Sequence, residues 1–290
     1  MSVEAPLEGR VALVTGGGSG IGLAIARRLG REGSTVVIAA RGEKAEAAQA
    51  MVDEENIDGR VVEWDIARFS DYDKRFKELR RAVGGRAISD FVSSAAVLRD
   101  GYTHHVSDKN DTLVIKTNQQ APHRIAKRLI PEMRQAKDGT ITFISSITGI
   151  HGHKLQTNYA QSKAANIALA RSLAAEHGPK GIRANAIAPG LVDTEIISKM
   201  PERMKREFLD NTISGEPLSA DDIAEATLAT ILDKDMNGQL VVVDDGHTAQ
   251  TDQAGGDHEY YIPGQGFVVL EVIQTMIEEA KRLRKAATKQ

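Results

Sequence analysis

The strongest structural signal in the chain is a run of glycines between a short apolar segment and a helical one. The β-branched run Val11–Thr15 leads into T-G-G-G-S-G-I-G, which spans residues 15–22, and a helical pattern follows at once. Glycine lets a ligand approach the backbone closely, and a helix N-terminus presents N–H groups without intrahelical partners. The order therefore predicts a site for the phosphates of a dinucleotide. Its spacing, T-G-x-x-x-G-x-G with Gly16, Gly20 and Gly22, differs from G-x-G-x-x-G.

Short β-branched runs alternate with longer helical patterns along most of the chain, which is typical of βαβ units in a parallel sheet. We expect strands at Val11–Thr15, Thr35–Ala40, Val61–Trp64, Asp90–Ser94, Thr140–Ser145, Arg183–Ala188 and Gln239–Val243. Helices are expected at Gly22–Arg31, Glu43–Glu55, Tyr72–Val83, Gln119–Ala136, Asn158–His177 and Ala220–Leu232. This predicts an α/β fold with a doubly wound, mostly seven-stranded parallel sheet in one domain, residues 1–250.

Composition excludes several kinds of protein. The 290 residues are 41% hydrophobic and 27% charged, enough to build a core, and the net charge of -3 does not suggest a nucleic-acid binder. The chain has no cysteine, which rules out disulfides, thiolate metal sites and a cysteine nucleophile. The N-terminal segment lacks secretory features, and no run of about 18 apolar residues could span a membrane. We therefore expect a soluble, cytoplasmic protein without a membrane partner.

A tyrosine and a lysine lie four residues apart on the helix expected at Asn158–His177. Tyr159 and Lys163 therefore share one face, about one turn apart. Such a pair is common by chance, but Ser146 ends a predicted strand 13 residues before Tyr159, and Asn118 lies 28 residues before Ser146. The ordered set of four polar residues indicates a catalytic site.

Together with the glycine turn, these residues make the chain, from about Arg10 to Gly246, resemble the classical short-chain dehydrogenase/reductase family. The resemblance implies an NAD(P)-dependent oxidoreductase with catalytic Asn118, Ser146, Tyr159 and Lys163, and no metal. It also implies a set of cofactor-binding residues: Gly16, Ser19, Gly20, Ile21, Gly22, Arg41, Asp65, Ile66, Ser94, Ala95, Tyr159, Lys163, Pro189, Gly190, Val192 and Thr194.

The end of the second predicted strand bears on the choice of cofactor. An NAD-dependent enzyme is expected to place an acidic side chain there, whereas this chain has Ala40 followed by Arg41. A guanidinium pairs with a 2′-phosphate that a carboxylate would repel. The sequence therefore favours NADP over NAD, with a carbonyl or secondary alcohol as the small-molecule substrate. NAD-linked alcohol oxidation is the alternative.

The expected chemistry needs a proton donor beside the carbonyl. A tyrosine pKa of about 10 is poorly suited to neutral pH, so we expect Lys163 to lower the pKa of Tyr159. Ser146 is expected to donate a hydrogen bond to the substrate oxygen. The resemblance implies that Asn118 holds a water linking Lys163 to solvent.

One segment departs from the family pattern. Ser93-Ser94-Ala95-Ala96 stands where the family usually has Asn-Asn-Ala-Gly. This departure keeps open a third hypothesis, a cofactor-binding scaffold or sensor with little turnover.

Three further segments carry expectations. The apolar stripe of 195–214 is expected either to cover the substrate as a flap or to pack as an ordinary helix. His151 and His153 are expected to be solvated loop residues. Residues 251–290 form a C-terminal extension, expected as a loop at 251–266 and an amphipathic helix at 268–285. Its stripe of Val269, Ile273, Met276 and Ile277 is expected to pack either on the same chain's flap or on a neighbouring subunit, and we favour the neighbouring subunit. The resemblance implies a homodimer or homotetramer whose main contacts are the helices at 119–136 and 158–177.

Overall fold

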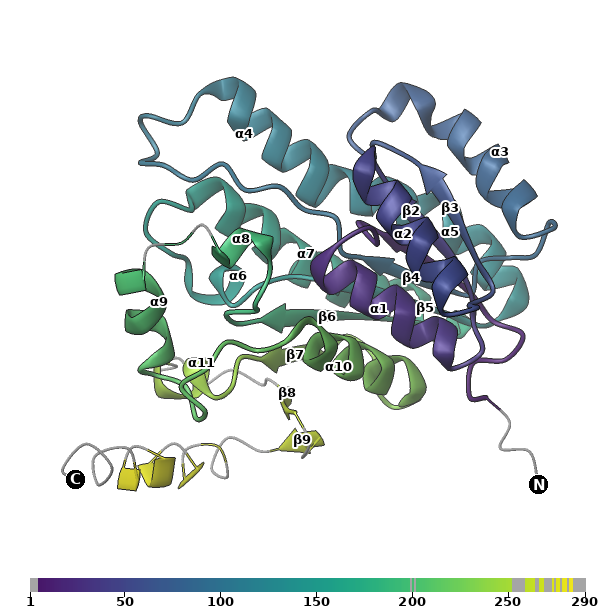
Figure 1. Cartoon of the computed structure of the whole chain (residues 1–290). Helices are drawn as coiled ribbons and strands as arrows, with labels where there is room; N and C mark the ends of the chain where they lie inside the picture. Colours follow the sequence, from purple (N-terminus) through teal and green to yellow (C-terminus); the bar gives the residue numbers. More distant parts are fainter. Residues whose placement is uncertain are drawn as a thin grey trace.

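The computed structural model describes residues 5–198, 200, 202–251, 259–263, 266–268, 273, 275–276, 278–280 and 282–283. A central sheet runs through the molecule, with helices on both faces (Figure 1). Its order is β3-β2-β1-β4-β5-β6-β7-β8-β9. The first seven strands are β1 (Val11–Thr15), β2 (Thr35–Ala40), β3 (Gly59–Glu63), β4 (Asp90–Ser93), β5 (Gly139–Ile144), β6 (Ile182–Pro189) and β7 (Leu240–Val243), and all of them pair in parallel. The predicted doubly wound α/β fold is confirmed.

The central strands are apolar on both sides because both sides are covered. Every residue of β1 and β2 is buried. Along β1, Val11 and Leu13 belong to one hydrophobic cluster and Ala12 and Val14 to the other, as the alternation of side chains in a strand requires. The continuous β-branched runs therefore predicted central strands correctly.

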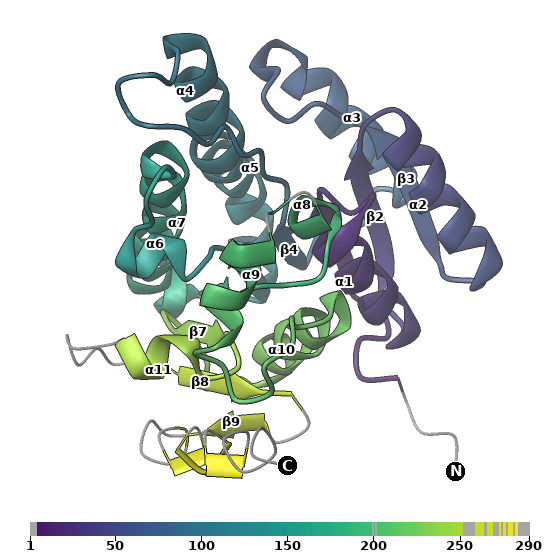
Figure 2. The same cartoon turned by 60° about the vertical axis from the view of Figure 1, so that its left-hand side comes forward.

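The major helices form the two outer layers. One cluster packs α1 (Gly20–Arg31), α2 (Glu43–Glu54) and α10 (Ala220–Leu232) against the sheet. The other packs α3 (Tyr72–Ala82), α5 (Ala121–Ala136) and α7 (Thr157–His177) on the opposite face. Figure 2 shows the two groups on either side of the sheet. These six helices agree with the predicted ones to within about two residues at each end.

Between β4 and α5 the chain forms an element that the sequence analysis did not predict. Helix α4 (Asp108–Ile115) runs into a π-helical turn, η2 (Lys116–Gln120), and then into α5. The Ser107 side chain caps α4 by accepting from the N–H of Asn110. The predicted start of α5 at Gln119 fell inside the π turn.

The sheet has nine strands rather than the seven predicted, because part of the expected loop at 251–266 is extended. Strand β8 (Glu259–Ile262) pairs in parallel with β7, and β9 (Gly266–Val268) pairs antiparallel with β8. The segment contains the strand-forming run Tyr260-Tyr261-Ile262, which its polar neighbours obscured in a composition-based reading. Tyr260 and Ile262 are buried.

Two described residues of the extension beyond β9 pack on their own chain. Ile273 is fully buried and belongs to the same cluster as α5 and α7, and Met276 packs against that cluster. These two side chains therefore have partners within the chain, whereas packing of the rest of the stripe on a neighbouring subunit stays a prediction. Val269 and Ile277, and most of the expected helix at 268–285, lie outside the described residues.

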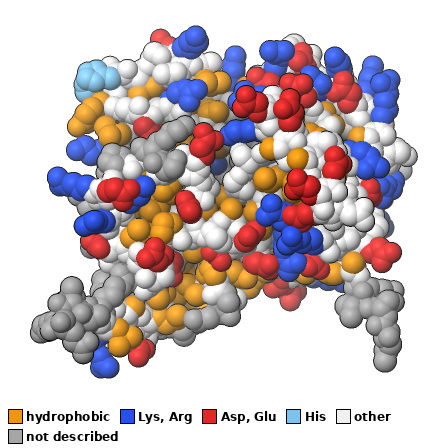
Figure 3. Space-filling view, viewed as in Figure 1, with side chains coloured by type: hydrophobic (Ala, Val, Ile, Leu, Met, Phe, Trp, Pro, Cys, Tyr) orange, Lys and Arg blue, Asp and Glu red, His pale blue; other side chains and the backbone are white. Residues whose placement is uncertain are grey.

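Several smaller elements and the surface complete the description. The short helices are α6 (Thr148–His151), α8 (Glu195–Ser198), α9 (Glu202–Leu209) and α11 (His247–Thr251), and single 3-10 turns lie at Phe69–Asp71 and Gly178–Lys180. Figure 3 shows charged side chains of both signs interspersed at the upper right, over α2 and α3, and hydrophobic ones gathered toward the lower left. No helix in the described part of the chain combines the length and apolar character needed to cross a membrane.

Candidate active site

A cavity of about 770 Å³ opens along the carboxyl ends of the parallel strands. This is where ligands bind in open α/β sheets, because the loops after successive strands meet at that edge. The cavity is lined by every residue predicted to contact cofactor or substrate, with the exception of Asn118. The fold thus brings together residues from Gly16 to Thr194 in one site.

The glycine turn forms one end of this cavity, and its glycines are required by close contacts. Gly16 has a φ of 72°, and a Cβ there would lie 2.6 Å from the Cα of Ala95. A Cβ on Gly22 would lie 2.3 Å from the carbonyl oxygen of Gly16. Any side chain at these positions would push the turn away from β4 or from the start of α1.

The N-terminus of α1 suits an anionic ligand. Ser19 is the N-cap residue, but its side chain makes no capping hydrogen bond, and the first turn contains no acidic residue. The N–H groups of that turn are therefore not satisfied by a cap, and the helix dipole favours negative charge beside them. These features fit the phosphates of a dinucleotide.

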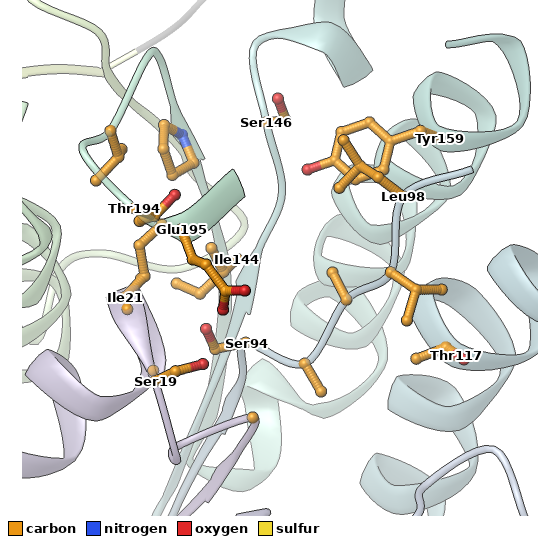
Figure 4. Close-up of a pocket in the computed structure, with 18 of the residues that line it drawn as sticks. Ser19, Ile21, Ser94, Leu98, Thr117, Ile144, Ser146, Tyr159, Thr194 and Glu195 are labelled. Atoms are coloured by element: carbon orange, nitrogen blue, oxygen red, sulfur yellow. The ribbon is translucent and has the colours of Figure 1, made fainter. Parts of the chain in front are cut away.

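The end of β2 lines the same cavity and carries the cofactor-selecting residues. Ala40 is buried, whereas the Arg41 side chain is 59% exposed and lies 3.5 Å from the carboxylate of Asp65 after β3. Lys44, on α2, lies 3.7 Å from the carboxylate of Glu195, the first residue of α8. Figure 4 shows the Glu195 carboxylate directed toward Ser94 and Ser19.

Tyr159, Ser146 and Lys163 meet at the other end of the cavity. Tyr159 directs its hydroxyl into the cavity on the side of Ser146 (Figure 4). The Ser146 Oγ accepts from the N–H of Thr148 at 3.1 Å. The Lys163 Nζ lies 5.5 Å from the centroid of the Tyr159 ring and donates to the carbonyl of Ile144 at 2.7 Å. The helical spacing therefore put Tyr159 and Lys163 on one face, as predicted.

The electrostatics of this pair differ from the prediction. Burial raises the pKa of Tyr159 to about 12, and the nearby polar side chain of Ser146 opposes that rise. Burial also lowers the pKa of Lys163 to about 8. Desolvation disfavours both charged forms, and the Lys163 ammonium is directed at the Ile144 carbonyl. The expected lowering of the Tyr159 pKa by Lys163 is therefore absent from this structure.

Asn118 lies in the π turn and does not line the cavity. Its side-chain oxygen, its side-chain nitrogen and its backbone carbonyl all have protein partners. Its side chain accepts from the N–H of Val97 at 2.9 Å and donates to the carbonyl of Val97 at 3.0 Å and to Ser162 at 3.2 Å. Its backbone carbonyl accepts from the side chain of Asn166 at 3.0 Å. Asn118 thus joins the segment after β4 to α7. That Asn118 holds a water linking Lys163 to solvent stays a prediction.

The serines and alanines after β4 are accommodated by close packing. Ser93 is buried, Ser94 donates its backbone N–H to the carbonyl of Thr15 at 3.1 Å, and Ala95 contacts Gly16. Ser94, Ala95 and Ala96 line the cavity. With these residues, the backbone after β4 runs directly past the glycine turn.

Sequence reasoning missed Asn166, which lies one turn beyond Lys163 on α7. It is 2% exposed, and its Oδ1 has no hydrogen-bond partner among the described residues. The available signal was an amide at the start of a buried apolar run, since the buried Ile167, Ala170 and Leu173 follow it on α7. His153, by contrast, is exposed as expected, and no metal-binding group of His, Asp or Glu occurs in the described residues.

The glycine turn, the arginine after β2 and the cavity-lining Ser146, Tyr159 and Lys163 together define an α/β dinucleotide-binding oxidoreductase. The family model described as short chain dehydrogenase matches residues 10–205. The chain belongs to this family, whose members bind a nicotinamide cofactor.

Named relatives cover most of the chain. The 3-oxoacyl-[acyl-carrier-protein] reductase FabG of Chlamydia trachomatis is 33% identical over 244 residues, which are 83% of this chain and 98% of that protein. The corresponding reductase MabA of Mycobacterium avium is 34% identical over 202 residues, 69% of this chain and 74% of that protein. The crystal structure of gox2181 superposes with a TM-score of 0.79 and 28% identity, covering 86% of this chain and 99% of that one.

Proposed function

We propose that this protein transfers hydride between NADP(H) and a carbonyl compound or the corresponding secondary alcohol, with carbonyl reduction as the favoured direction. The observation that carries the proposal is a single cavity lined at one end by Arg41 and at the other by Ser146, Tyr159 and Lys163. A bound dinucleotide would supply the hydride from its nicotinamide ring.

The preference for NADP rests on the residues at the end of β2. Arg41 is exposed at the cavity and can form a charge-assisted pair with a 2′-phosphate. Ala40 occupies the place where a carboxylate would favour the 2′-hydroxyl of NAD. Asp65 is the competing partner of Arg41, and its own exposure leaves that pair weak.

Proton transfer rests on Tyr159 and Ser146. A pKa of about 12 keeps the Tyr159 phenol protonated at neutral pH, as a donor to the developing alkoxide must be. The Ser146 Oγ accepts from a backbone N–H, which leaves its hydroxyl proton available for the substrate oxygen. The Lys163 ammonium is buried 5.5 Å from the ring centroid and donates to the Ile144 carbonyl, so it would stabilise the phenolate only after turning toward the Tyr159 hydroxyl in the loaded site.

The substrate end of the cavity suits a carbonyl compound with an apolar substituent. Leu98, Leu155, Met200 and Phe208 line it, while polar side chains, including Lys154, line it as well. A substrate with an apolar chain attached to a polar group would match this lining. Because the named relatives are 3-oxoacyl reductases, 3-oxoacyl thioesters are the first compounds to test.

Two alternatives make different predictions. NAD-linked alcohol oxidation requires NADH to bind at least as tightly as NADPH, which the exposed Arg41 disfavours. A scaffold or sensor would bind cofactor without turnover, and the presence of Ser146, Tyr159 and Lys163 in one cavity disfavours it. Measuring binding and turnover with both cofactors separates all three.

The test of the cofactor uses Arg41→Ala. Loss of the charged pair should weaken NADPH binding by about 10- to 100-fold and leave NADH binding nearly unchanged, because NADH lacks the 2′-phosphate. Dissociation constants can be measured by fluorescence titration. Arg60→Ala is the matched control, since Arg60 is also exposed but does not line the cavity. Equal losses for both cofactors, or tighter NADH binding by the unmodified protein, would refute the assignment to NADP.

A further inference from the structure

The segment from Thr194 to Ser214, here called the flap, is tied down at both of its ends. At the first end, the N–H of Asp193 donates to the carbonyl of Leu218 at 2.7 Å, and the N–H of Leu218 donates to that of Leu191 at 2.9 Å. At the second, the N–H groups of Ile213 and Ser214 donate to the backbone carbonyl and the side chain of Asp245, at 2.8 and 2.6 Å. The position of the middle of the flap depends on other contacts.

One of these contacts joins Phe208, on α9, to His247, the first residue of α11. Their rings stack with centroids 3.9 Å apart and planes 3° apart. The Nδ1 of His247 also lies 3.1 Å from the backbone carbonyl of Phe208. Because a carbonyl only accepts, this contact requires the proton on Nδ1. His247 therefore holds both the ring and the backbone of one flap residue.

This contact lies on the substrate side of the cavity. Phe208 lines the cavity together with Met200 and Ile197 of the same flap. Burial lowers the pKa of His247, and its hydrogen bond to the Phe208 carbonyl opposes that effect. In both ribbon views, α9 lies between α11 and the helix α8 that begins the flap (Figures 1 and 2).

We propose that Phe208 limits the size of the substrate substituent and that His247 is the positioning residue that holds Phe208 in the cavity wall. The inference rests on the proposed function and adds a specificity determinant to it. The ring of Phe208 gives the cavity an apolar surface and also stacks on the imidazole of His247. His247 follows β7 directly after the turn Asp244–Gly246, which holds it in place. Substrate size is thereby linked to the element that begins the C-terminal extension.

The test compares four variants on a series of 3-oxoacyl thioesters of increasing chain length. Phe208→Ala should raise KM for the shortest substrate about tenfold and move the optimum of kcat/KM to longer chains. His247→Ala should change the profile in the same direction, whereas His247→Phe, which can keep the ring stack, should change it less. Phe76→Leu is the control, because Phe76 is likewise partly buried but does not line the cavity.

The double variant Phe208→Ala/His247→Ala decides whether the two residues act as one unit. It should resemble Phe208→Ala alone, because His247 then has no ring to position. If the effects of the two single variants simply multiply, or if Phe208→Ala slows all chain lengths by the same factor, the proposal is wrong.

A second measurement does not depend on turnover. Hydrogen exchange of the amides at 202–214 should be faster in His247→Ala than in the unmodified protein, and nearly unchanged in Phe76→Leu. Unchanged exchange in His247→Ala would overturn the positioning role. If the unmodified protein reduces no carbonyl compound with either cofactor, the proposed function fails and the specificity role fails with it, while faster exchange would still assign the positioning contact.

Discussion

Tyr159 carries the proton in the proposed reaction, and its hydroxyl can be removed without removing the ring. Tyr159→Phe should lower kcat for carbonyl reduction by about 100- to 10,000-fold, because the proton donor is lost while the aromatic packing remains. Turnover under saturating substrate and the thermal midpoint of unfolding should be measured together. Activity within a few-fold of the unmodified protein, at an unchanged midpoint, would show that another group donates the proton.

Lys163 gives the site its pH dependence. Burial places its pKa at about 8, so its positive charge is present below that pH and is lost above it. The rate of carbonyl reduction should therefore be level near neutral pH and fall as the pH rises through about 8, well before Tyr159 titrates at about 12. Initial rates from pH 6 to 10 at saturating cofactor would test this. A rate that stays level through pH 9 would mean that Lys163 keeps its charge in the working complex.

At the scale of elements, α10 has an N-terminus that stabilises it locally. The Ser219 Oγ accepts from the N–H of Asp222 at 3.1 Å, and the Asp222 carboxylate accepts from the N–H of Ser219 at 2.7 Å, which forms a capping box. Ser219→Ala should lower the free energy of unfolding by about 1 kcal/mol. Urea denaturation measures this, and Ser219→Thr, which keeps the hydroxyl, should lose clearly less. Equal losses would show that the hydroxyl is not what matters.

At the scale of the whole molecule, β8 and the residues after it complete the core. Tyr260, Ile262 and Ile273 are buried. Burial of one such apolar side chain stabilises the folded state by about 1.5–3 kcal/mol, and removing the residue removes that contribution. A chain ending at Gln250 should therefore unfold at a clearly lower temperature. Ile273→Ala is the milder variant and should cost about 2–5 kcal/mol. Both can be measured by thermal and urea unfolding.

The same truncation tests where subunits meet. The homodimer or homotetramer expected from the resemblance uses α5 and α7, which the truncation leaves intact. Light scattering should then give the same number of subunits for the full and the shortened chain. A fall to the monomer with unchanged stability would instead place the extension in the subunit interface.

Much of the site followed from the sequence because its signals are local. The glycine turn needs a strand before it and a helix after it, and all three are adjacent in the chain. Tyr159 and Lys163 share a face because of the helical period alone. The buried strands were recognisable in the sequence as β-branched runs, because parallel strands are covered on both sides.

Other features depend on which distant segments meet, and only the tertiary structure decided them. Asn118 binds Val97 and Asn166, Lys163 donates to the carbonyl of Ile144, and Phe208 stacks on His247. Strand β8 pairs with the edge of β7. The residues at 259–262 cannot by themselves indicate that this edge is available. The pKa values of Tyr159 and Lys163 belong to this class as well. They are set by how completely the folded chain removes water from each group, and that depends on packing from every side.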